Sequence, residues 1–266
     1  MNSRHFRILA GVALCSASLG GVCAAAESSP WSVALYAGDA DSGSGKFRSE
    51  QTASIANLGT FDPKLAGASG TLSLDRLGYH EAYHNRFSAA LEVGYALNEN
   101  LQAFGRFGYD ARQGRERDIG SLSSAGLASR QRVIAHFGNS DSRGLEVGAR
   151  YLWLASEKWR PYVAVSVGAT RTDDMNASLN VTNTAINIRQ VRFAKSGSTF
   201  SQSFETGVEY NPIKQFGLRL SVRANHVGTP PSDRDPQLTA LGFNSGNDAG
   251  NRVDYPIALA GVYHFD

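Results

Sequence analysis

The alternation of apolar and polar residues is the feature that most constrains the fold of this chain. In segment 87–97, the odd-numbered positions are Phe, Ala, Leu, Val, Tyr and Leu, whereas Ser88, Glu92 and small residues occupy the others. Successive side chains of a β-strand point to opposite faces, so a period of two predicts a strand with one apolar and one polar face. A tight polar turn at 98–100 follows, and the alternation then resumes in segment 101–109.

The same unit of strand, short turn and strand recurs twice more, and one single strand stands at each end of the series. The further alternating segments are 145–153 with 163–169, 203–210 with 216–225, and the single strands 31–38 and 253–265. Together with the first hairpin they make eight strands. An even number is typical of antiparallel barrels in bacterial outer membranes.

The connections alternate in length, which points to the same architecture. Three turns are short, and the polar connections are long: 39–85, 111–143, 171–201 and 227–252. Short periplasmic turns and long extracellular loops are typical of transmembrane β-barrels. We therefore expect an all-β, antiparallel transmembrane β-barrel with eight strands.

A barrel of ten strands is the alternative, because connection 39–85 contains weaker alternation. Segments 52–61 and 71–77 could form two more strands around a turn at Asp62-Pro63. We prefer eight strands, because 43–51 and 80–86 have the composition of loops.

The first 26 residues have the features of a cleaved secretory signal peptide. Arg4 and Arg7 precede an apolar stretch from 8 to 22, and Ala24-Ala25-Ala26 resembles a cleavage site. The expected organisation is a signal peptide at 1–26 and an outer-membrane barrel at 27–266. Both cysteines, Cys15 and Cys23, lie in the leader, so we expect no disulfide, thiol nucleophile or cysteine metal site in the mature chain.

Composition excludes other classes of protein. The net charge is only +2, which does not favour nucleic-acid binding. The mean hydropathy is −0.27, and no run after the leader approaches the ~18 apolar residues of a membrane-spanning helix. Barrel strands need only every second residue to be apolar, so they are compatible with such a sequence.

Aromatic residues cluster at the ends of the strands that adjoin the short turns. Outer-membrane barrels carry aromatic girdles at the membrane interfaces. The expected periplasmic girdle consists of Trp31, Tyr95, Trp153, Trp159, Tyr210, Phe216, Tyr263 and Phe265.

Two hairpins and the last strand resemble those of a known group. LEVGYALNENLQAFGRFGYD, FETGVEYNPIKQFGLRLSVR and YPIALAGVYHF are similar to small outer-membrane barrels of the OmpA transmembrane-domain and OmpX type. The resemblance is architectural and implies a fold and a location in the bacterial outer membrane after signal-peptide cleavage. It also implies outer-membrane lipid, lipopolysaccharide, and the secretion and barrel-assembly machineries as partners of a monomer. In that group the last residue is aromatic, whereas Asp266 follows Phe265 here.

The polar faces of the predicted strands carry charges of both signs that would line the lumen. They are Glu92, Arg106, Glu146, Arg150, Glu205, Glu209, Arg219, Arg223 and Asp254. The first turn places Glu92 opposite Arg106, and the third turn places Arg219 opposite Gly207. Small barrels are filled by side chains, so a plug of ion pairs is preferred over a gated pore, which remains the alternative.

Connection 111–143 is basic, and Arg112, Arg115 and Arg117 directly follow a predicted strand. Guanidinium groups bind phosphates bidentately, so these arginines are candidates for lipopolysaccharide contact. An ordinary solvated loop is the equally weighted alternative.

Candidate catalytic motifs are weak. His80-Glu81-Ala82-Tyr83-His84 matches the H-E-x-x-H zinc pattern, but that site needs a helix, and the flanking residues do not predict one. His226 resembles the histidine of lipid A deacylase barrels, yet Gly228 stands where those enzymes have a serine. We expect no catalytic residue, metal or cofactor.

The function that these observations favour is a non-enzymatic structural or surface-interaction role through the extracellular loops. A narrow, passive, porin-like channel for small solutes is the alternative, and a lipid A-modifying barrel enzyme is a third.

Overall fold

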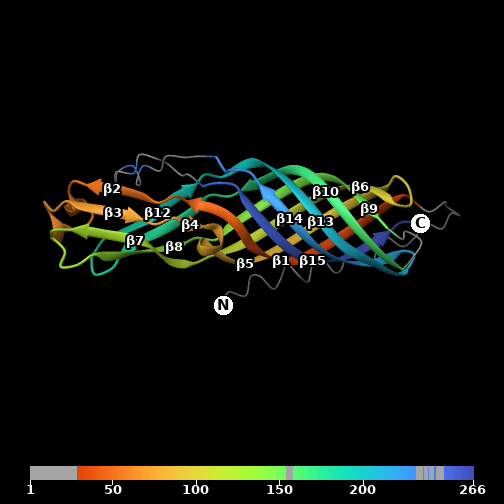
Figure 1. The fold of residues 1–266 in the computed structure, drawn as a ribbon, viewed down its shortest axis with the longest axis horizontal. Coiled ribbons are helices and arrows are strands. Elements are labelled where there is room, and N and C mark those ends of the chain that lie inside the picture. The colour runs from red at the N-terminus through yellow and green to blue at the C-terminus, as the bar shows by residue number, and fades with distance from the viewer. Residues whose placement is uncertain (1–28, 154–157, 232–235, 237–238, 240–242, 244–248) are drawn as a thin grey trace. The chain divides into compact units, whose positions relative to one another are not determined.

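The computed structural model describes the chain except for residues 1–28, 154–157, 232–235, 237–238, 240–242 and 244–248. The expected signal peptide and part of the second short turn therefore lie outside the described residues. Residues 30–265 form one compact unit, built almost entirely from antiparallel strands (Figure 1). No described helix has the length and apolarity needed to span a bilayer.

Eight strands close into a barrel, which confirms the eight-stranded prediction. In spatial order they are β1 (Trp31–Arg48), β5 (Tyr83–Ala96), β6 (Leu101–Gly114), β9 (Ser140–Leu152), β10 (Trp159–Thr172), β13 (Gly197–Ile213), β14 (Phe216–Val227) and β15 (Arg252–His264). Pairing of β15 with β1 completes the cylinder. The two-residue strand β4 (Leu77–Gly78) pairs only with the far end of β1.

The strand register sets the tilt of the barrel. From Asp39, the pairing through Phe87 reaches Ala111 of β6. In the other direction, the pairing through Ile257 passes around the barrel to Leu101 of β6. These two positions are ten residues apart on one strand. With eight strands, that offset corresponds to a tilt of about 40°, as in small outer-membrane barrels.

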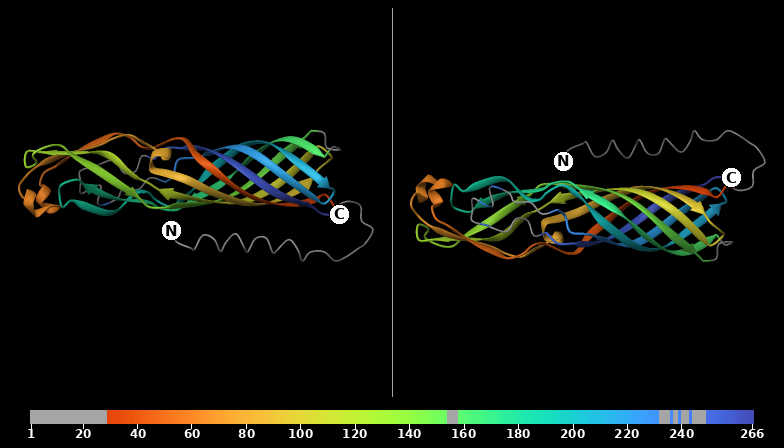
Figure 2. Two further views of the ribbon diagram at one scale, coloured as in Figure 1. Left: turned by 90° about the horizontal axis from the view of Figure 1, so that it is seen from below. Right: turned by 90° about the horizontal axis from the view of Figure 1, so that it is seen from above.

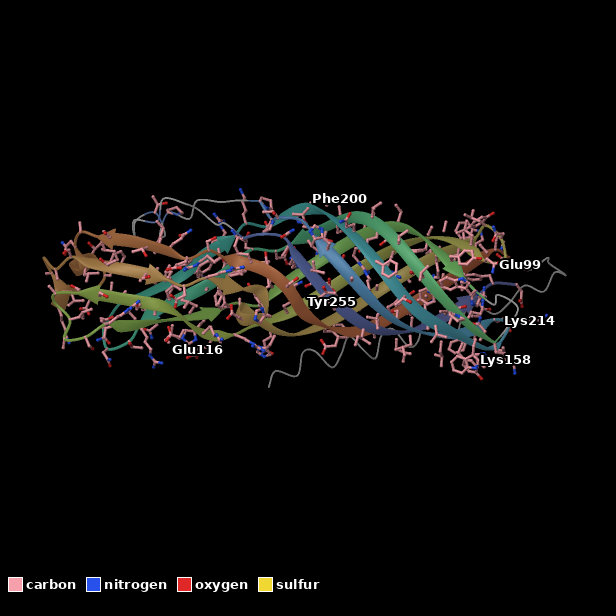
Figure 3. All side chains as sticks on the ribbon, viewed as in Figure 1. Glu99, Glu116, Lys158, Phe200, Lys214 and Tyr255 are labelled. Atoms are coloured by element: carbon pink, nitrogen blue, oxygen red, sulfur yellow. The ribbon has the colours of Figure 1, made fainter. Side chains whose placement is uncertain are left out.

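The outer surface of the barrel is apolar. Among the described residues, every large apolar side chain that is exposed lies on these eight strands or on their short turns. Leu145 is 64% exposed and Phe200 60%, and Phe200 and Tyr255 project outwards in Figure 3. The partner of such a surface is lipid rather than water.

The predicted girdle residues lie at the end of the barrel that carries the short turns, marked by Glu99, Lys158 and Lys214 in Figure 3. Adjacent rings pack in pairs, with centroid distances of 4.9 Å for Trp31 and Tyr95, 5.3 Å for Tyr151 and Trp153, 4.4 Å for Trp159 and Tyr210, and 5.1 Å for Tyr263 and Phe265.

Three of the four long connections, 39–85, 111–143 and 171–201, are not the polar loops that the sequence predicts. They form a second, six-stranded sheet: β2 (Gln51–Ile55), β3 (Gly70–Leu74), β7 (Glu116–Ser124), β8 (Gln131–Phe137), β11 (Met175–Val181) and β12 (Asn187–Ala194). The two extra strands of the ten-stranded alternative exist as β2 and β3, but they pair with each other and with β7. The short helices η1 (Leu58–Thr60) and η2 (Pro63–Leu65) cap the far end of this sheet (Figure 2).

The second sheet encloses an apolar core, which is the opposite arrangement to that of the barrel. On β11, Met175, Ala177, Leu179 and Val181 are buried and alternate with polar residues. Phe47 lies at the centre, with ring centroids between 5.3 and 5.8 Å from those of Tyr79, Tyr83, Phe137 and Phe193. A sheet that is apolar inside and polar outside is suited to water, so this part of the chain lies beyond the membrane.

Irregularities in the register of β1 and of β5 allow each strand to face lipid in the barrel and the apolar core in the second sheet. Between Asp41 and Ser44, β1 advances three residues while β15 advances two. Between His84 and Arg86, β5 advances two residues while β6 advances one. One extra residue reverses which face each following side chain occupies. Phe47 therefore points into the apolar core, whereas Leu35, which has the same parity, faces lipid.

Asp62 ties η2 to the connection between β11 and β12. Its carboxylate accepts hydrogen bonds from the backbone N–H groups of Ala185 at 2.9 Å and Lys64 at 3.0 Å. These two bonds, in that order of effect, hold the pKa of Asp62 below its usual value. The connection is thus fixed at its tip by a charged residue.

Candidate functional site: the charged lumen

The polar interior of the barrel is centred on Glu92, whose buried carboxylate accepts hydrogen bonds from three arginines. Arg106 reaches Oε2 with Nε at 3.0 Å and Nη2 at 2.7 Å. Arg150 donates to both oxygens, at 2.9 and 3.0 Å, and Arg219 Nη1 lies 2.8 Å from Oε1. The Tyr36 hydroxyl adds a bond of 3.2 Å. Glu92 therefore joins strands from opposite sides of the lumen.

Two further glutamates balance the charge of these arginines. Glu205 accepts a hydrogen bond from Arg106 Nη1 at 2.7 Å and another from the Tyr162 hydroxyl at 2.8 Å. Glu209 accepts one from Arg219 Nε at 3.0 Å. The layer thus contains three guanidinium groups and three carboxylates. Charges removed from water are tolerated only when they are paired and hydrogen-bonded in this way.

Aromatic rings fill the remaining cross-section of the layer. The guanidinium of Arg106 lies 4.6 Å from the ring centroid of Tyr36, and that of Arg150 lies 4.9 Å from the rings of both Phe104 and Tyr162. Both Arg150 and Tyr162 are fully buried. Stacked cations on ring faces add attraction when water is excluded.

A second group of charges lies nearer the second sheet. Glu146 forms an ion pair with Arg223 and accepts a hydrogen bond from Ser166 Oγ at 2.9 Å. Farther along the lumen, Asp254 pairs with Arg112 at 3.0 Å and with Arg252 at 3.2 Å. Charged contacts therefore extend along the lumen beyond the Glu92 layer.

A small cavity remains among these groups. It has a volume of about 40 Å³ and is lined by polar residues that include Arg106, Asp110, Glu146 and Arg223. One water needs roughly 10–15 Å³ of such space, so the cavity can hold a few waters.

The structure brings together the charges that the sequence assigns to the lumen, but one expected register is wrong. Glu92 lies opposite Arg106, as the first turn predicts. Arg219 lies opposite Glu209 rather than opposite Gly207. The reason is that β13 continues to Ile213 and pairs with Phe216 through an irregular turn, which shifts the pairing by two residues.

The lipopolysaccharide assignment of Arg112 is also wrong. Strand β6 continues to Gly114, so Arg112 keeps the parity of Arg106 and points into the lumen. Its side chain is 2% exposed and forms an ion pair with Asp254. Arg115 and Arg117 are exposed at the start of the second sheet, and Arg117 Nη2 lies 3.7 Å from Glu81. The three arginines therefore do not share a face.

This placement predicts different effects for the three arginines. Arg112→Gln should destabilise the folded barrel by about 3–5 kcal/mol, because it leaves part of a buried ion network without its partner. Arg115→Gln and Arg117→Gln should change stability by less than about 1 kcal/mol, because they alter exposed charges. Urea unfolding in detergent measures the difference. Equal, small effects for all three would contradict the lumen position of Arg112.

The histidines of the weak catalytic motifs lie on different elements. His80 belongs to the four-residue helix α2 (Tyr79–Ala82) and His84 to β5. The Glu81 carboxylate accepts the Gly78 N–H at 2.6 Å. His226 contacts the Asn251 side chain at 3.0 Å. Among the described residues, no group of three histidine or acidic side chains is arranged to hold a metal ion.

Sequence reasoning missed several residues that complete the lumen. Tyr36 and Tyr162 close the Glu92 layer, Gln102 accepts from Arg150 at 2.7 Å, and Arg252 joins the outer group. Their parity was available in the sequence, because each alternates with outward apolar residues on its strand. Three of them are uncharged, and Arg252 lies one residue before the predicted strand 253–265, so they are not among the predicted lumen charges.

Comparison with known proteins identifies the same β-barrel architecture. The sequence matches the family described as "Outer membrane protein beta-barrel domain" over residues 9–246. No curated protein matches it.

Among solved structures, Neisserial surface protein A is 13% identical with a TM-score of 0.40, over 90% of this chain and 100% of that chain. OprG from Pseudomonas aeruginosa is 11% identical with a TM-score of 0.43, over 90% and 98%. Ail of Yersinia pestis, in complex with the heparin analogue sucrose octasulfate, is 10% identical with a TM-score of 0.37, over 88% and 99%.

Proposed function

Because this chain belongs to the family of outer-membrane protein β-barrel domains, we propose that it is a non-conducting, non-enzymatic barrel that acts through its extracellular sheet. The observation that carries this proposal is the contrast between the two interiors. A lumen filled with buried ion pairs lies within the membrane-spanning part, and a packed apolar core lies within the second sheet.

The closed lumen supports a structural rather than a transport role. A solute would have to displace Glu92 from Arg106, Arg150 and Arg219 at once. Separating a buried carboxylate from its partners costs several kcal/mol for each partner lost. The narrow channel that the sequence leaves open is therefore the weaker candidate.

The second sheet supports a role at the cell surface. Solvated loops alone would not require a core of this kind. A rigid scaffold with polar outer faces is suited to present a fixed surface to a partner. Its outer face is rich in hydroxyl groups, and Ser54, Thr71 and Ser123 lie side by side on β2, β3 and β7.

Removal of the second sheet tests this role. We expect cells that produce a shortened barrel, with β2, β3, β7, β8, β11 and β12 replaced by tight turns, to lose retention on immobilised polysaccharide, lipid or protein surfaces. The shortened barrel must first be shown to fold, by its shifted migration in unheated gels. Equal retention of cells with the full and shortened forms on all three kinds of surface would contradict the proposal.

A further inference from the structure

Gln202 of β13 is a polar residue on the outward, apolar face of the barrel wall. Its side chain is exposed and lies between the outward rings of Phe200 and Phe204, which are 60% and 52% exposed. Phe200 projects away from the barrel in Figure 3. The cross-strand partners of Gln202 are Val167 of β10 and His226 of β14. Gln202 therefore shares its face with apolar residues that contact lipid.

Gln202 lies within the apolar band of the barrel. It is eight residues along β13 from Tyr210 of the periplasmic girdle. At about 3.3 Å per residue and a tilt of about 40°, this separation spans about 20 Å along the barrel axis. The apolar band of an outer-membrane barrel is about 25 Å tall, and the outward ring of Phe200 lies farther from the girdle than Gln202. The amide group is therefore in lipid, where water does not serve as its partner.

Two other polar side chains on this part of the wall have partners in the same chain. The Thr206 hydroxyl donates to the Tyr162 backbone oxygen at 3.2 Å, and His226 Nε2 lies 3.0 Å from the Asn251 amide nitrogen. Among the residues that the structure describes, none forms a hydrogen bond with the Gln202 side chain. Polar groups left unpaired in hydrocarbon are costly. The Gln202 amide thus requires a partner from outside the chain.

We propose that a second copy of this chain packs against the β13 wall, with the two Gln202 amides hydrogen-bonded to each other. A carboxamide carries both a donor and an acceptor, so two of them form a reciprocal pair. In a dimer with its twofold axis along the membrane normal, both copies of Gln202 lie at the same height, and each residue at the axis meets its own copy. Phe200, Phe204 and Val167 then form the apolar part of the interface.

The occupant is a second copy rather than lipid, because acyl chains contain no group that can pair with an amide. Hydrogen bonds between polar side chains also link membrane-spanning helices, where lipid likewise surrounds the interface. A dimer differs from the monomer that the resemblance implies. It goes beyond the proposed surface role, which does not depend on it.

Cysteine cross-linking in vesicles at low protein density tests the proposal. The only cysteines of the sequence are Cys15 and Cys23, so a thiol introduced into the barrel of a chain that begins at residue 27 reports only its own surroundings. Phe204→Cys, beside Gln202 on β13, should give a covalent dimer with a short bis-maleimide reagent. Phe107→Cys is the matched control and should give none, because Phe107 is 51% exposed on β6, which does not adjoin β13.

The substitution Gln202→Leu separates the amide pair from the apolar contacts. Added to Phe204→Cys, it should weaken dimerisation by about tenfold, because it removes the hydrogen bonds across the interface. The yield of covalent dimer over a series of dilutions in lipid measures this change. Thr206→Val, which removes a hydroxyl bonded within the chain, should leave dimerisation unchanged. Both variants should keep the shifted migration of the folded barrel in unheated gels.

Three results would overturn the proposal. The first is the absence of a covalent dimer from Phe204→Cys, which would indicate a monomer surrounded by lipid. The second is equal cross-linking of Phe204→Cys and Phe107→Cys, which would indicate random collisions. The third is undiminished dimerisation after Gln202→Leu, which would show that the amide pair does not hold the two copies together.

Discussion

Replacement of Glu92 by glutamine is expected to destabilise the barrel by about 3–5 kcal/mol, the cost of leaving buried charges without a partner. Glutamine keeps the size of the side chain but removes the charge that faces Arg106, Arg150 and Arg219. Urea unfolding in detergent, followed by tryptophan fluorescence, measures the loss. Glu146→Gln provides a comparison, because Glu146 has a partly exposed ion pair with Arg223, and its effect should be smaller.

A second substitution identifies which arginine depends most on Glu92. Without Glu92, Arg106 keeps Glu205 at 2.7 Å and Arg219 keeps Glu209. Among the acidic side chains of the described residues, Arg150 keeps a longer contact of 3.7 Å with Glu205. The double variant Glu92→Gln/Arg150→Met should therefore recover part of the lost stability, whereas Glu92→Gln/Arg219→Met should recover none. Equal behaviour of the two double variants would contradict this account of the network.

Replacement of Phe47 by alanine is expected to open the second sheet while the barrel stays folded. Phe47 is 1% exposed and contacts four aromatic rings. Removing a buried phenylalanine costs about 3–5 kcal/mol. We expect this cost to fall on the second sheet, because the short strands there share that one core, whereas the barrel is held by its own closed hydrogen-bond network.

Limited proteolysis of the intact protein in detergent or vesicles measures this effect. Cleavage should become faster within the second sheet, and the unheated protein should keep its shifted migration in gels. Phe200→Ala is the matched control, because it removes the same ring from the lipid-facing wall and should leave proteolysis unchanged. Loss of the folded barrel in Phe47→Ala, or no change in cleavage, would contradict the division into two separately stabilised parts.

The membrane-spanning part could be predicted from the sequence because its pattern is long and regular. Strands such as β9 and β10 alternate over more than ten residues, and the three short turns fix the order of the hairpins. The inward-facing charges could be predicted from the alternation, and the first turn determined the pairing of Glu92 with Arg106.

The second sheet could not be predicted as readily, for two physical reasons. Its strands are short, and β2 and β3 have five residues each, so polar connections with a few apolar residues resemble loops. The register irregularities in β1 and β5 also reverse the facing of residues such as Phe47 and Tyr83. A regular pattern of two extended across them places these aromatic residues in lipid. The alternation of Met175 to Val181 was the clearest available indication.

The limits of the predicted strands explain the remaining errors. A strand that ends near Tyr109 leaves Arg112 in a loop, whereas β6 runs to Gly114 and turns Arg112 inwards.

Single-channel recording in planar lipid bilayers tests the central claim most directly. Refolded wild-type protein, verified by its gel migration, is added to a bilayer in concentrated potassium chloride, with a known porin as the positive control. A lumen closed by the Glu92 network predicts a baseline without stable conductance steps. Reproducible steps of uniform size from the wild-type protein would show that the lumen conducts, and would contradict the proposal of a closed barrel that acts through its extracellular sheet.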